Sequence, residues 1–390
     1  MVLFDTKTQK KQKLILDVGS SRVNCVLARY LPEEKIEIIR LFQSDGVILP
    51  EANLKALWRR VSSLIEGVVS SFKKSGLKAD EALVVFSSPW YFSEVSDIKR
   101  EFNEPTEITE SFFESALESV SEDFKERAAG ALKIRADDLS FTNLAVMSAK
   151  LNGYAIKNPE KNIFGKIVRN LSVSVYISSF FGEAARATKR LLEDCGIKSV
   201  DFRSSSQVLF ETVSQLGHDN ITVVDVGGEI TDVIMIKDGE IKKSVSFGRG
   251  LNYVARRMGP VFKIGLEETM SLLSNYIEGK LEDSFKESVA KALREAIIEW
   301  KSMFKEVLQR HAAPEFAPSK VLVTGHGGGV TELKKILADP ELSNYTPENR
   351  PFEVLERLPE RVLGRFKNAD YILKKPYLYL INFYLIYAAK

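Results

Sequence analysis

Apolar and polar positions are patterned along the chain as in an α/β protein. Two segments, Leu14–Ala28 and Ile221–Ile236, show the pattern most clearly: a short β-branched or aliphatic run ends at an aspartate and a glycine. Each is predicted to form a strand, a tight turn and a returning strand. Because Asp17-Val-Gly in the first matches Asp225-Val-Gly in the second, we expect an internal repeat and two similar halves.

The remaining periodicity predicts further strands and helices around these hairpins. Asn53 and Thr109 stand where helix N-caps are expected. A third glycine feature, Val321–Val330, reads as a strand that runs into a glycine turn and then a helix. The apolar segment Tyr377–Ala389 suits a buried helix, with Pro376 in its first turn. Strands are expected at 36–39, 83–86, 144–147, 151–156, 171–177, 200–203 and 241–247, and helices at 54–72, 112–124, 182–195, 206–213, 266–276 and 285–308.

Composition is that of a soluble globular protein. The chain has 390 residues, 44% hydrophobic and 28% charged, which is too long for one ordinary core. A net charge of +2 gives no reason to expect nucleic acid as a partner. The two cysteines and three histidines lack metal-site spacing, and neither a signal peptide nor a run long enough to span a membrane is expected. The cytoplasm is the expected compartment.

The two hairpins carry candidate chemistry. Paired glycines in a turn leave backbone N–H groups free to face a phosphate, and a nearby carboxylate can hold Mg²⁺. A single Asp-x-Gly-Gly hairpin is more often structural than functional. Two such hairpins followed by a glycine turn form a more specific combination.

This combination resembles the actin-like ATPase superfamily, in which two α/β halves close on ATP. Within it, the segment Ser88–Cys195 is similar to the subdomain found in the bacterial division protein FtsA and the pilus-assembly protein PilM. Three further stretches resemble theirs: Leu151–Pro159, Gly248–Asn252 and Lys375–Tyr379. The implied fold class is α/β: a duplicated, ribonuclease H-like two-domain ATPase fold with an inserted α+β subdomain.

The resemblance implies four parts. The first half comprises residues 1–87 and 196–220, interrupted by the inserted subdomain at 88–195. The second half comprises 221–251 and 319–390, with a small helical subdomain at 252–318.

The resemblance also implies a Mg·ATP site. Asp17 and Asp225 would organise Mg²⁺ and the attacking water, and Gln207 stands where actin-type proteins carry a water-orienting glutamine; an ordinary exposed helix residue is the alternative for Gln207. The implied nucleotide-binding residues are Gly19, Ser20, Ser21, Arg22, Gly227, Gly228, Thr231, Glu268, Gly325, Gly327 and Gly328.

Three departures from the family pattern bear on nucleotide binding. Glu229 stands where the family has a small residue, and a carboxylate beside phosphates is repulsive unless it turns away or meets Mg²⁺. The family's Glu-x-x-Lys becomes Glu267 or Glu268 followed by Met270 or Ser271, and His326 interrupts the glycine turn.

The first expected function is an FtsA-like, ATP-binding scaffold of cell division that self-associates into filaments and reaches the membrane through a protein partner. A PilM-like scaffold of type IV pilus assembly is the alternative, favoured by the expectation that the chain stops at Lys390, where an FtsA-type membrane helix would begin. A metabolic kinase would need a carboxylate base near an acceptor hydroxyl, and a DnaK-type chaperone would need a further domain. The expected enzyme activity is at most a slow Mg²⁺-dependent ATPase.

Overall fold

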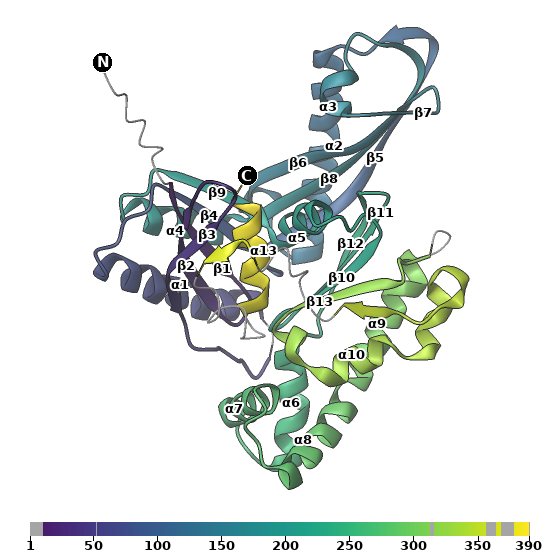
Figure 1. Cartoon of the computed structure of the whole chain (residues 1–390). Helices are drawn as coiled ribbons and strands as arrows, with labels where there is room; N and C mark the ends of the chain where they lie inside the picture. The colour runs from purple at the N-terminus through teal and green to yellow at the C-terminus, as the bar shows by residue number, and fades with distance from the viewer. Residues whose placement is uncertain (1–10, 52, 313–315, 356–363, 368–377, 390) are drawn as a thin grey trace.

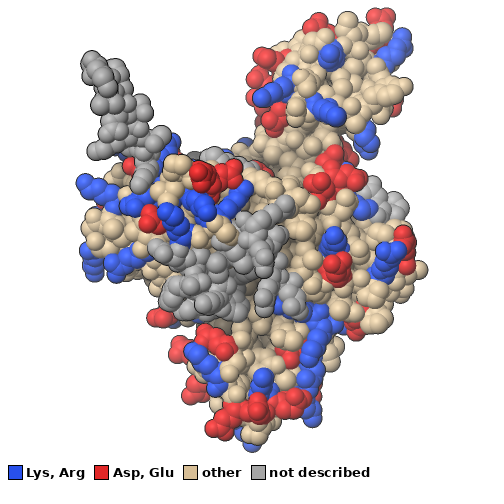
Figure 2. Space-filling view, viewed as in Figure 1, with Lys and Arg blue, Asp and Glu red and all other residues tan. Residues whose placement is uncertain are grey.

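The computed structural model describes residues 11–51, 53–312, 316–355, 364–367 and 378–389. Figure 1 shows a body containing two sheets, a lobe that extends away from it at the top right, and a helical lobe at the bottom. Acidic and basic side chains are interspersed over the face seen in Figure 2, in keeping with the small net charge.

The two sheets of the body repeat one arrangement, in which an antiparallel three-stranded meander continues into parallel strands. The first sheet has the order β15-β3-β2-β1-β4-β9, and the second has the order β12-β11-β10-β13-β14. The first contains β1 (Gln12–Val18), β2 (Val23–Tyr30), β3 (Ile36–Gln43), β4 (Glu81–Phe86), β9 (Ser199–Ser204) and β15 (Phe366–Lys367). The second contains β10 (Ile221–Val226), β11 (Thr231–Lys237), β12 (Glu240–Phe247), β13 (Lys320–Gly325) and β14 (Glu353–Leu355). The predicted internal repeat is therefore present in the topology.

Each central strand divides its side chains between two cores, because successive residues of a strand point to opposite faces. Leu14 and Leu16 of β1 pack under α1 (Leu54–Lys74) and α4 (Gly182–Glu193), whereas Ile15 faces α5 (Ser205–Gln215) and α13 (Tyr379–Tyr387). In β10, Val223 joins Ile15 in that shared core, and Val224 faces the helical lobe. The two halves thus share a core around α5 and α13.

The extended lobe is a four-stranded sheet, β5-β8-β6-β7, with α2 on one face. Thr109 caps α2 as predicted: its Oγ1 accepts a hydrogen bond from Phe112 N (3.2 Å). The long strand β5 was not predicted, because most of its side chains beyond Ile98 are exposed and charged or polar. The lobe contains β5 (Tyr91–Glu107), α2 (Glu110–Leu132), η1 (Ala136–Asp138), β6 (Leu139–Leu151), β7 (Tyr154–Ile156), α3 (Pro159–Asn162) and β8 (Ile167–Phe181).

The helical lobe follows β12 and corrects one prediction. The apolar stripe at 285–308 belongs to two helices rather than one, because the backbone at Ile297 (φ −89°, ψ 0°) breaks it. After the break, Trp300 packs into the core under the second sheet. The lobe and the segments after it contain α6 (Leu251–Phe262), α7 (Leu266–Ile277), α8 (Asp283–Ala296), α9 (Ile298–His311), η2 (His326–Gly329), α10 (Thr331–Leu337), η3 (Pro340–Tyr345) and η4 (Pro347–Asn349).

The C-terminal segment differs from its expected place in the second half. Phe366 and Lys367 pair with β3, so β15 belongs to the first sheet. Helix α13 is buried as predicted, but it packs against α5, β1 and β13, between the halves. The proposed first-turn role of Pro376 and most of the Lys375–Tyr379 resemblance lie outside the described residues. Within the described part of the chain, no helix combines the length and apolarity needed to cross a bilayer.

Candidate functional site

The turns of the two Asp-Val-Gly hairpins lie against each other. One backbone hydrogen bond closes each turn, from Gly19 N to Arg22 O (3.0 Å) and from Gly227 N to Ile230 O (2.9 Å). Across the halves, Ser20 Oγ accepts a hydrogen bond from Glu229 N (2.9 Å). A Cβ on Gly228 would overlap the Ser21 side chain. The lack of a side chain at Gly228 therefore allows the two turns to approach closely.

Asp17 lies at the end of β1 and is almost fully buried, with 6% of its surface exposed. Its Oδ2 accepts a hydrogen bond from Asn24 Nδ2 (2.9 Å), whereas its buried Oδ1 has no hydrogen-bond partner among the described residues. Burial raises the pKa of this carboxyl to about 6, although the Asn24 hydrogen bond opposes the rise. An unpartnered carboxylate oxygen in this position is a ready ligand for a cation or its water.

Asp225 lies at the matching place in β10, with 2% of its surface exposed. Thr324 Oγ1 donates a hydrogen bond to its Oδ1 (3.1 Å). Burial raises the pKa of Asp225 to about 8, and the charges of Asp232 and Asp17 add to the rise. The negative charge of Asp17 thus disfavours ionisation of Asp225, and a divalent cation near the two carboxyls would favour it.

A third buried carboxylate, Asp232, was not selected from the sequence. It is the cross-strand partner of Asp225 in the β10–β11 pair. Its Oδ1 accepts hydrogen bonds from the hydroxyls of Ser88 (2.7 Å) and Ser246. The signal was a polar residue within an otherwise apolar strand. Among the described residues, no cluster of three or more His, Cys, Asp or Glu side chains is arranged to hold a metal ion, so a cation here would rest on the aspartate pair and on water or phosphate oxygens.

Glu229 turns away from the hairpin turns. Arg256 of α6 donates to both of its carboxylate oxygens, from Nη2 to Oε2 (2.6 Å) and from Nη1 to Oε1 (3.0 Å), and Asn252 Nδ2 donates to Oε1 (2.8 Å). Arg256 also donates to Leu49 O (3.0 Å), and Asn252 to Val47 O (3.1 Å), both in the first half. The expected repulsion of phosphates is therefore neutralised, and the Glu229 network fastens the two halves together.

Thr231 does not face the hairpin turns as the resemblance implied. Its hydroxyl donates to Arg249 O (2.7 Å) and accepts from Trp300 Nε1 (3.0 Å), and the residue is fully buried. Both hydrogen bonds fix the helical lobe to the second sheet. The Thr231 hydroxyl is thus engaged within the second half, and a role of Thr231 toward a nucleotide stays a prediction.

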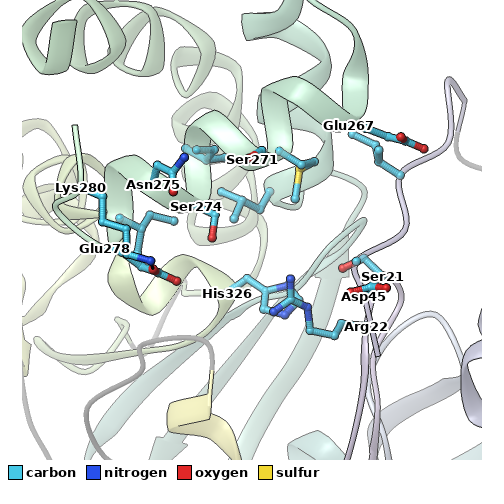
Figure 3. Close-up of a pocket in the computed structure, with 16 residues that line it drawn as sticks. Ser21, Arg22, Asp45, Glu267, Ser271, Ser274, Asn275, Glu278, Lys280 and His326 are labelled. Atoms are coloured by element: carbon cyan, nitrogen blue, oxygen red, sulfur yellow. Dashed lines mark ion pairs between the residues drawn. The ribbon is translucent and has the colours of Figure 1, made fainter. Parts of the chain in front are cut away.

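A cavity of about 660 Å³ opens beside the hairpins, between the first half and α7. Figure 3 shows Ser21, Arg22 and Asp45 on one side, Ser271, Ser274 and Asn275 of α7 on the other, and His326 between them. The volume is within the range of small-molecule sites, roughly 300–1,000 Å³. The Arg22 guanidinium supplies positive charge where an anionic group could bind.

His326 replaces the expected glycines at the cavity wall. Burial and the nearby charge of Arg22 lower the pKa of His326 to about 3, so its imidazole is neutral. A Cβ on Gly325 would overlap Asp225 Oδ1, and one on Gly327 would overlap the Val226 side chain. Gly325 also has a positive φ of 69°. Gly325 and Gly327 therefore allow the turn to pack closely against β10. Gly328 lies against Val323 O of β13.

Two other predicted site residues have local partners. Glu268 Oε2 accepts a hydrogen bond from Gly265 N (2.9 Å) and so caps its own helix, whereas Glu267 lines the cavity. Gln207 is buried rather than exposed, and its Nε2 donates to Glu211 Oε1 (3.0 Å). Glu267, Ser271 and Ser274 share the face of α7 that lines the cavity, whereas Glu268 does not line it. The role of either glutamate toward a nucleotide stays a prediction.

Comparison with known proteins adds sequence and fold relationships. No family model matches the chain. The chain is 20% identical over 279 residues to the cell division protein FtsA of Neisseria meningitidis serogroup B. That alignment covers 69% of this chain and 62% of FtsA, so the chain spans less than two thirds of the relative's length.

Two solved structures match nearly the whole chain. One is the PilM–PilN type IV pilus biogenesis complex, with a TM-score of 0.60 and 12% identity, covering 97% of this chain and 98% of the other. The second is the ethanolamine utilization protein EutJ from Carboxydothermus hydrogenoformans, with a TM-score of 0.50 and 12% identity, covering 98% of this chain and 91% of EutJ. These likenesses concern the fold, and they confirm the fold class expected from the sequence.

Proposed function

We propose, from an actin-like ATPase fold of the FtsA and PilM type, that the chain is an ATP-binding scaffold protein. The observation that carries the proposal is the pairing of the two hairpins. Asp17 and Asp225 are buried at equivalent strand ends, and Ser21 and Arg22 of the first hairpin turn line a cavity of about 660 Å³. The hydrogen bond from Glu229 N to Ser20 Oγ joins the two turns, which come from distant parts of the sequence.

In this proposal the nucleotide occupies the cavity, with its phosphates toward Ser21 and Arg22 and its base toward Ser271, Ser274 and Asn275. Arg22 neutralises phosphate charge, and the polar α7 side chains can hydrogen-bond the base or ribose. The unpartnered Asp17 Oδ1 and the effect of the Asp17 charge on Asp225 fit a bound Mg²⁺, which would screen negative charge on the phosphates.

Hydrolysis is proposed to be slow. Phosphoryl transfer to water depends on positioning and charge stabilisation, and Gln207, the candidate for orienting water, is engaged with Glu211. The buried aspartates would orient water through hydrogen bonds. A phosphate-release assay should detect at most slow turnover. Turnover that depends on an added sugar or acid would instead favour a metabolic kinase.

The role proposed for the scaffold is to link a cytoplasmic cell-division assembly to the membrane through a partner protein, with self-association into filaments. The FtsA similarity supports this role. A PilM-like role in type IV pilus assembly is the second candidate, supported by a fold match to the PilM–PilN complex that covers nearly the whole of both chains. Identification of the proteins that co-purify with the native chain separates the two roles.

Membrane attachment is proposed to be indirect, because the apolar helix α13 is buried between the halves and offers no exposed face to lipid. The purified chain should remain with the soluble fraction in vesicle flotation, and flotation with anionic vesicles alone would contradict this. The expected division of the chain is likewise a proposal: 1–87 with 196–220, the insert 88–195, 221–251 with 319–390, and 252–318. It requires moving β15 to the first half.

The cavity assignment is tested by filling the cavity without altering the aspartates. Ser274 lines the cavity from an exposed position on α7, so Ser274→Trp should leave the fold intact and occupy the space. We expect the affinity for a fluorescent ATP analogue to fall at least about tenfold, equivalent to about 1.4 kcal/mol. Ser284→Trp, at an exposed position of α8, is the control. Equal affinity in wild type and Ser274→Trp would place the nucleotide elsewhere.

A further inference from the structure

Another cavity, of about 630 Å³, lies between the extended lobe and the second sheet (Figure 1), and it shares no lining residue with the cavity beside the hairpins. Three acidic side chains line it, together with five lysines: Lys99, Lys150, Lys237, Lys242 and Lys243. Positive charge is therefore in excess here, although the whole chain carries a net charge of only +2. A cavity of this kind favours an anionic ligand.

One wall of this cavity is the face of the lobe sheet that α2 leaves open. Ile98 and Val173 belong to the core under α2, so the residues next to them, Lys99 and Ser172, point to the opposite face. Ser172 is the cross-strand partner of Lys99 in β5 and of Lys150 in β6. The open face thus presents a row of an ammonium, a hydroxyl and a second ammonium to the cavity.

The opposite wall contains an open strand edge. β12 is the edge strand of the second sheet, and among the described strands it pairs with β11 alone. The lobe reaches this edge at Ser244, whose hydroxyl shares a hydrogen bond with that of Ser93 in β5 (3.0 Å). The residues of β12 that precede this contact, Glu240, Lys242 and Lys243, line the cavity. An open edge offers backbone N–H and C=O groups to another strand.

Two of the lysines carry charge that no described residue neutralises. Lys242 pairs with Glu240 (2.6 Å), and Lys99 lies 3.9 Å from Asp97. In contrast, Lys150 and Lys243 are exposed, and neither forms an ion pair or a side-chain hydrogen bond within the described part of the chain. Lys150 comes from the lobe and Lys243 from the second sheet, so positive charge meets a ligand from both walls.

We propose that this cavity binds an acidic, extended segment of a partner protein, which pairs with the open edge of β12 and directs carboxylates to Lys150 and Lys243. A peptide backbone supplies the alternating donors and acceptors that an open strand edge can pair with, whereas nucleic acid and free phosphate do not. The inference rests on the proposed scaffold role and deepens it, because it names the docking surface and the charge of the partner segment.

Protection of the strand edge is the alternative role for these lysines. Lysine side chains on edge strands prevent sheets from joining edge to edge, and Lys243 on β12 could serve this purpose alone. Lys150 does not fit that explanation, because β6 lies between β8 and β7 in the lobe sheet and is not an edge strand. If protection were the only role, reversing both charges would leave peptide binding unchanged.

The experiment selects a displayed library of short random peptides on the full chain and measures the affinity of the enriched peptides by fluorescence anisotropy. We expect acidic residues at alternate positions of these peptides. The combined variant Lys150→Glu, Lys243→Glu should bind them at least about tenfold more weakly, because like charges then face each other. Lys150→Gln and Lys243→Gln, which only remove a charge, should each have a smaller effect in the same direction. Lys55→Glu combined with Lys78→Glu, on two exposed lysines outside the cavity, is the control.

Three outcomes would overturn the inference. The first is enriched peptides that lack acidic residues, or that bind the Lys150→Glu, Lys243→Glu variant within about twofold of wild type. The second is unchanged affinity after N-methylation of alternate peptide amides, which excludes pairing with β12. The third is a lysine-dependent affinity for single-stranded oligothymidylate with no peptide enriched, which reassigns the cavity to nucleic acid. Stabilisation by Mg·ATP, measured on the same variants, should persist in all three cases and tests the proposed ATP site separately.

Discussion

At the scale of single residues, three buried carboxylates determine how the centre of the molecule behaves. Very little of the surface of these residues, Asp17, Asp225 and Asp232, is accessible to solvent. Burial is the main cause that raises the pKa of each carboxyl. Hydroxyl and amide groups donate hydrogen bonds to most of their carboxylate oxygens, but Asp17 Oδ1 has no hydrogen-bond partner in the described structure. Negative charge at this place is therefore costly without a counter-ion, which gives the metal-free protein a defined pH dependence.

Burial raises the pKa of Asp17 to about 6 and that of Asp225 to about 8. Since each folded-state pKa exceeds that of the unfolded chain, the folded state binds these protons more tightly, so their contribution to stability is largest at low pH and is lost as pH rises from about 4 to about 8. We expect Asp225→Asn to flatten the fall in melting temperature between pH 6 and pH 8, measured by thermal unfolding in chelator. Asp137→Asn, on an exposed carboxyl, is the control, and an unchanged slope in Asp225→Asn would contradict the assignment.

The ion pair of Glu229 and Arg256 should contribute strongly to the stability of the protein. Their side chains are only 2% and 17% exposed, and removing one partner of a buried pair leaves an uncompensated charge. Glu229→Gln should therefore destabilise the protein by about 3–5 kcal/mol in urea unfolding. Glu287→Gln, which breaks the exposed pair with Arg294, should have a far smaller effect, because solvent screens an exposed ion pair. Equal effects of the two substitutions would show that Glu229 does not fasten the halves.

At the scale of elements, the hairpins show what a sequence pattern can and cannot predict. The strands and the caps at Asn53 and Thr109 follow from local pattern and were confirmed. The partner of Glu229 could not be predicted, because Arg256 is 27 positions away and meets Glu229 only when α6 packs against the turn. The helix break at Ile297 was missed because the apolar stripe continues through it. The long strand β5 was missed because it has few buried apolar side chains.

Gly228 provides the element-scale test, because its role is the close approach of two turns. A Cβ there would overlap Ser21 Oγ and Cβ, whereas a Cβ on Gly248 would meet nothing within 4 Å. Neither glycine has a positive φ, so the comparison isolates crowding. We expect Gly228→Ala to cost about 1–3 kcal/mol of unfolding free energy and Gly248→Ala to cost little. If the two alanine variants melt alike, the turns do not lie as close as described.

At the scale of the whole molecule, the duplicated sheets explain why the position of the candidate site could be predicted from the sequence. The contacts of its individual residues could not be predicted, because they depend on the core that the two halves share. The repeated Asp-Val-Gly sequence indicated two similar halves that face each other. The repeated strand arrangement and the hydrogen bond from Glu229 N to Ser20 Oγ agree with this. The glycine turn, Thr231 and Glu268 were expected to bind the nucleotide. The structure shows their packing and capping contacts, and their role toward a nucleotide stays a prediction. Burial of α13 was predicted from its apolar composition, but its contacts with both halves depend on tertiary packing.

If the paired hairpins bind Mg·ATP, the thermal unfolding of the protein should depend on whether Mg·ATP is present. At a free ligand concentration about 100 times the dissociation constant, binding should stabilise the wild type by roughly 2.7 kcal/mol and raise its melting temperature visibly. Asp17→Ala and Asp225→Ala should each lose most of that increment, because each removes one of the two buried carboxylates. A wild type that melts at the same temperature with and without Mg·ATP, or aspartate variants that retain the full increment, would contradict the account.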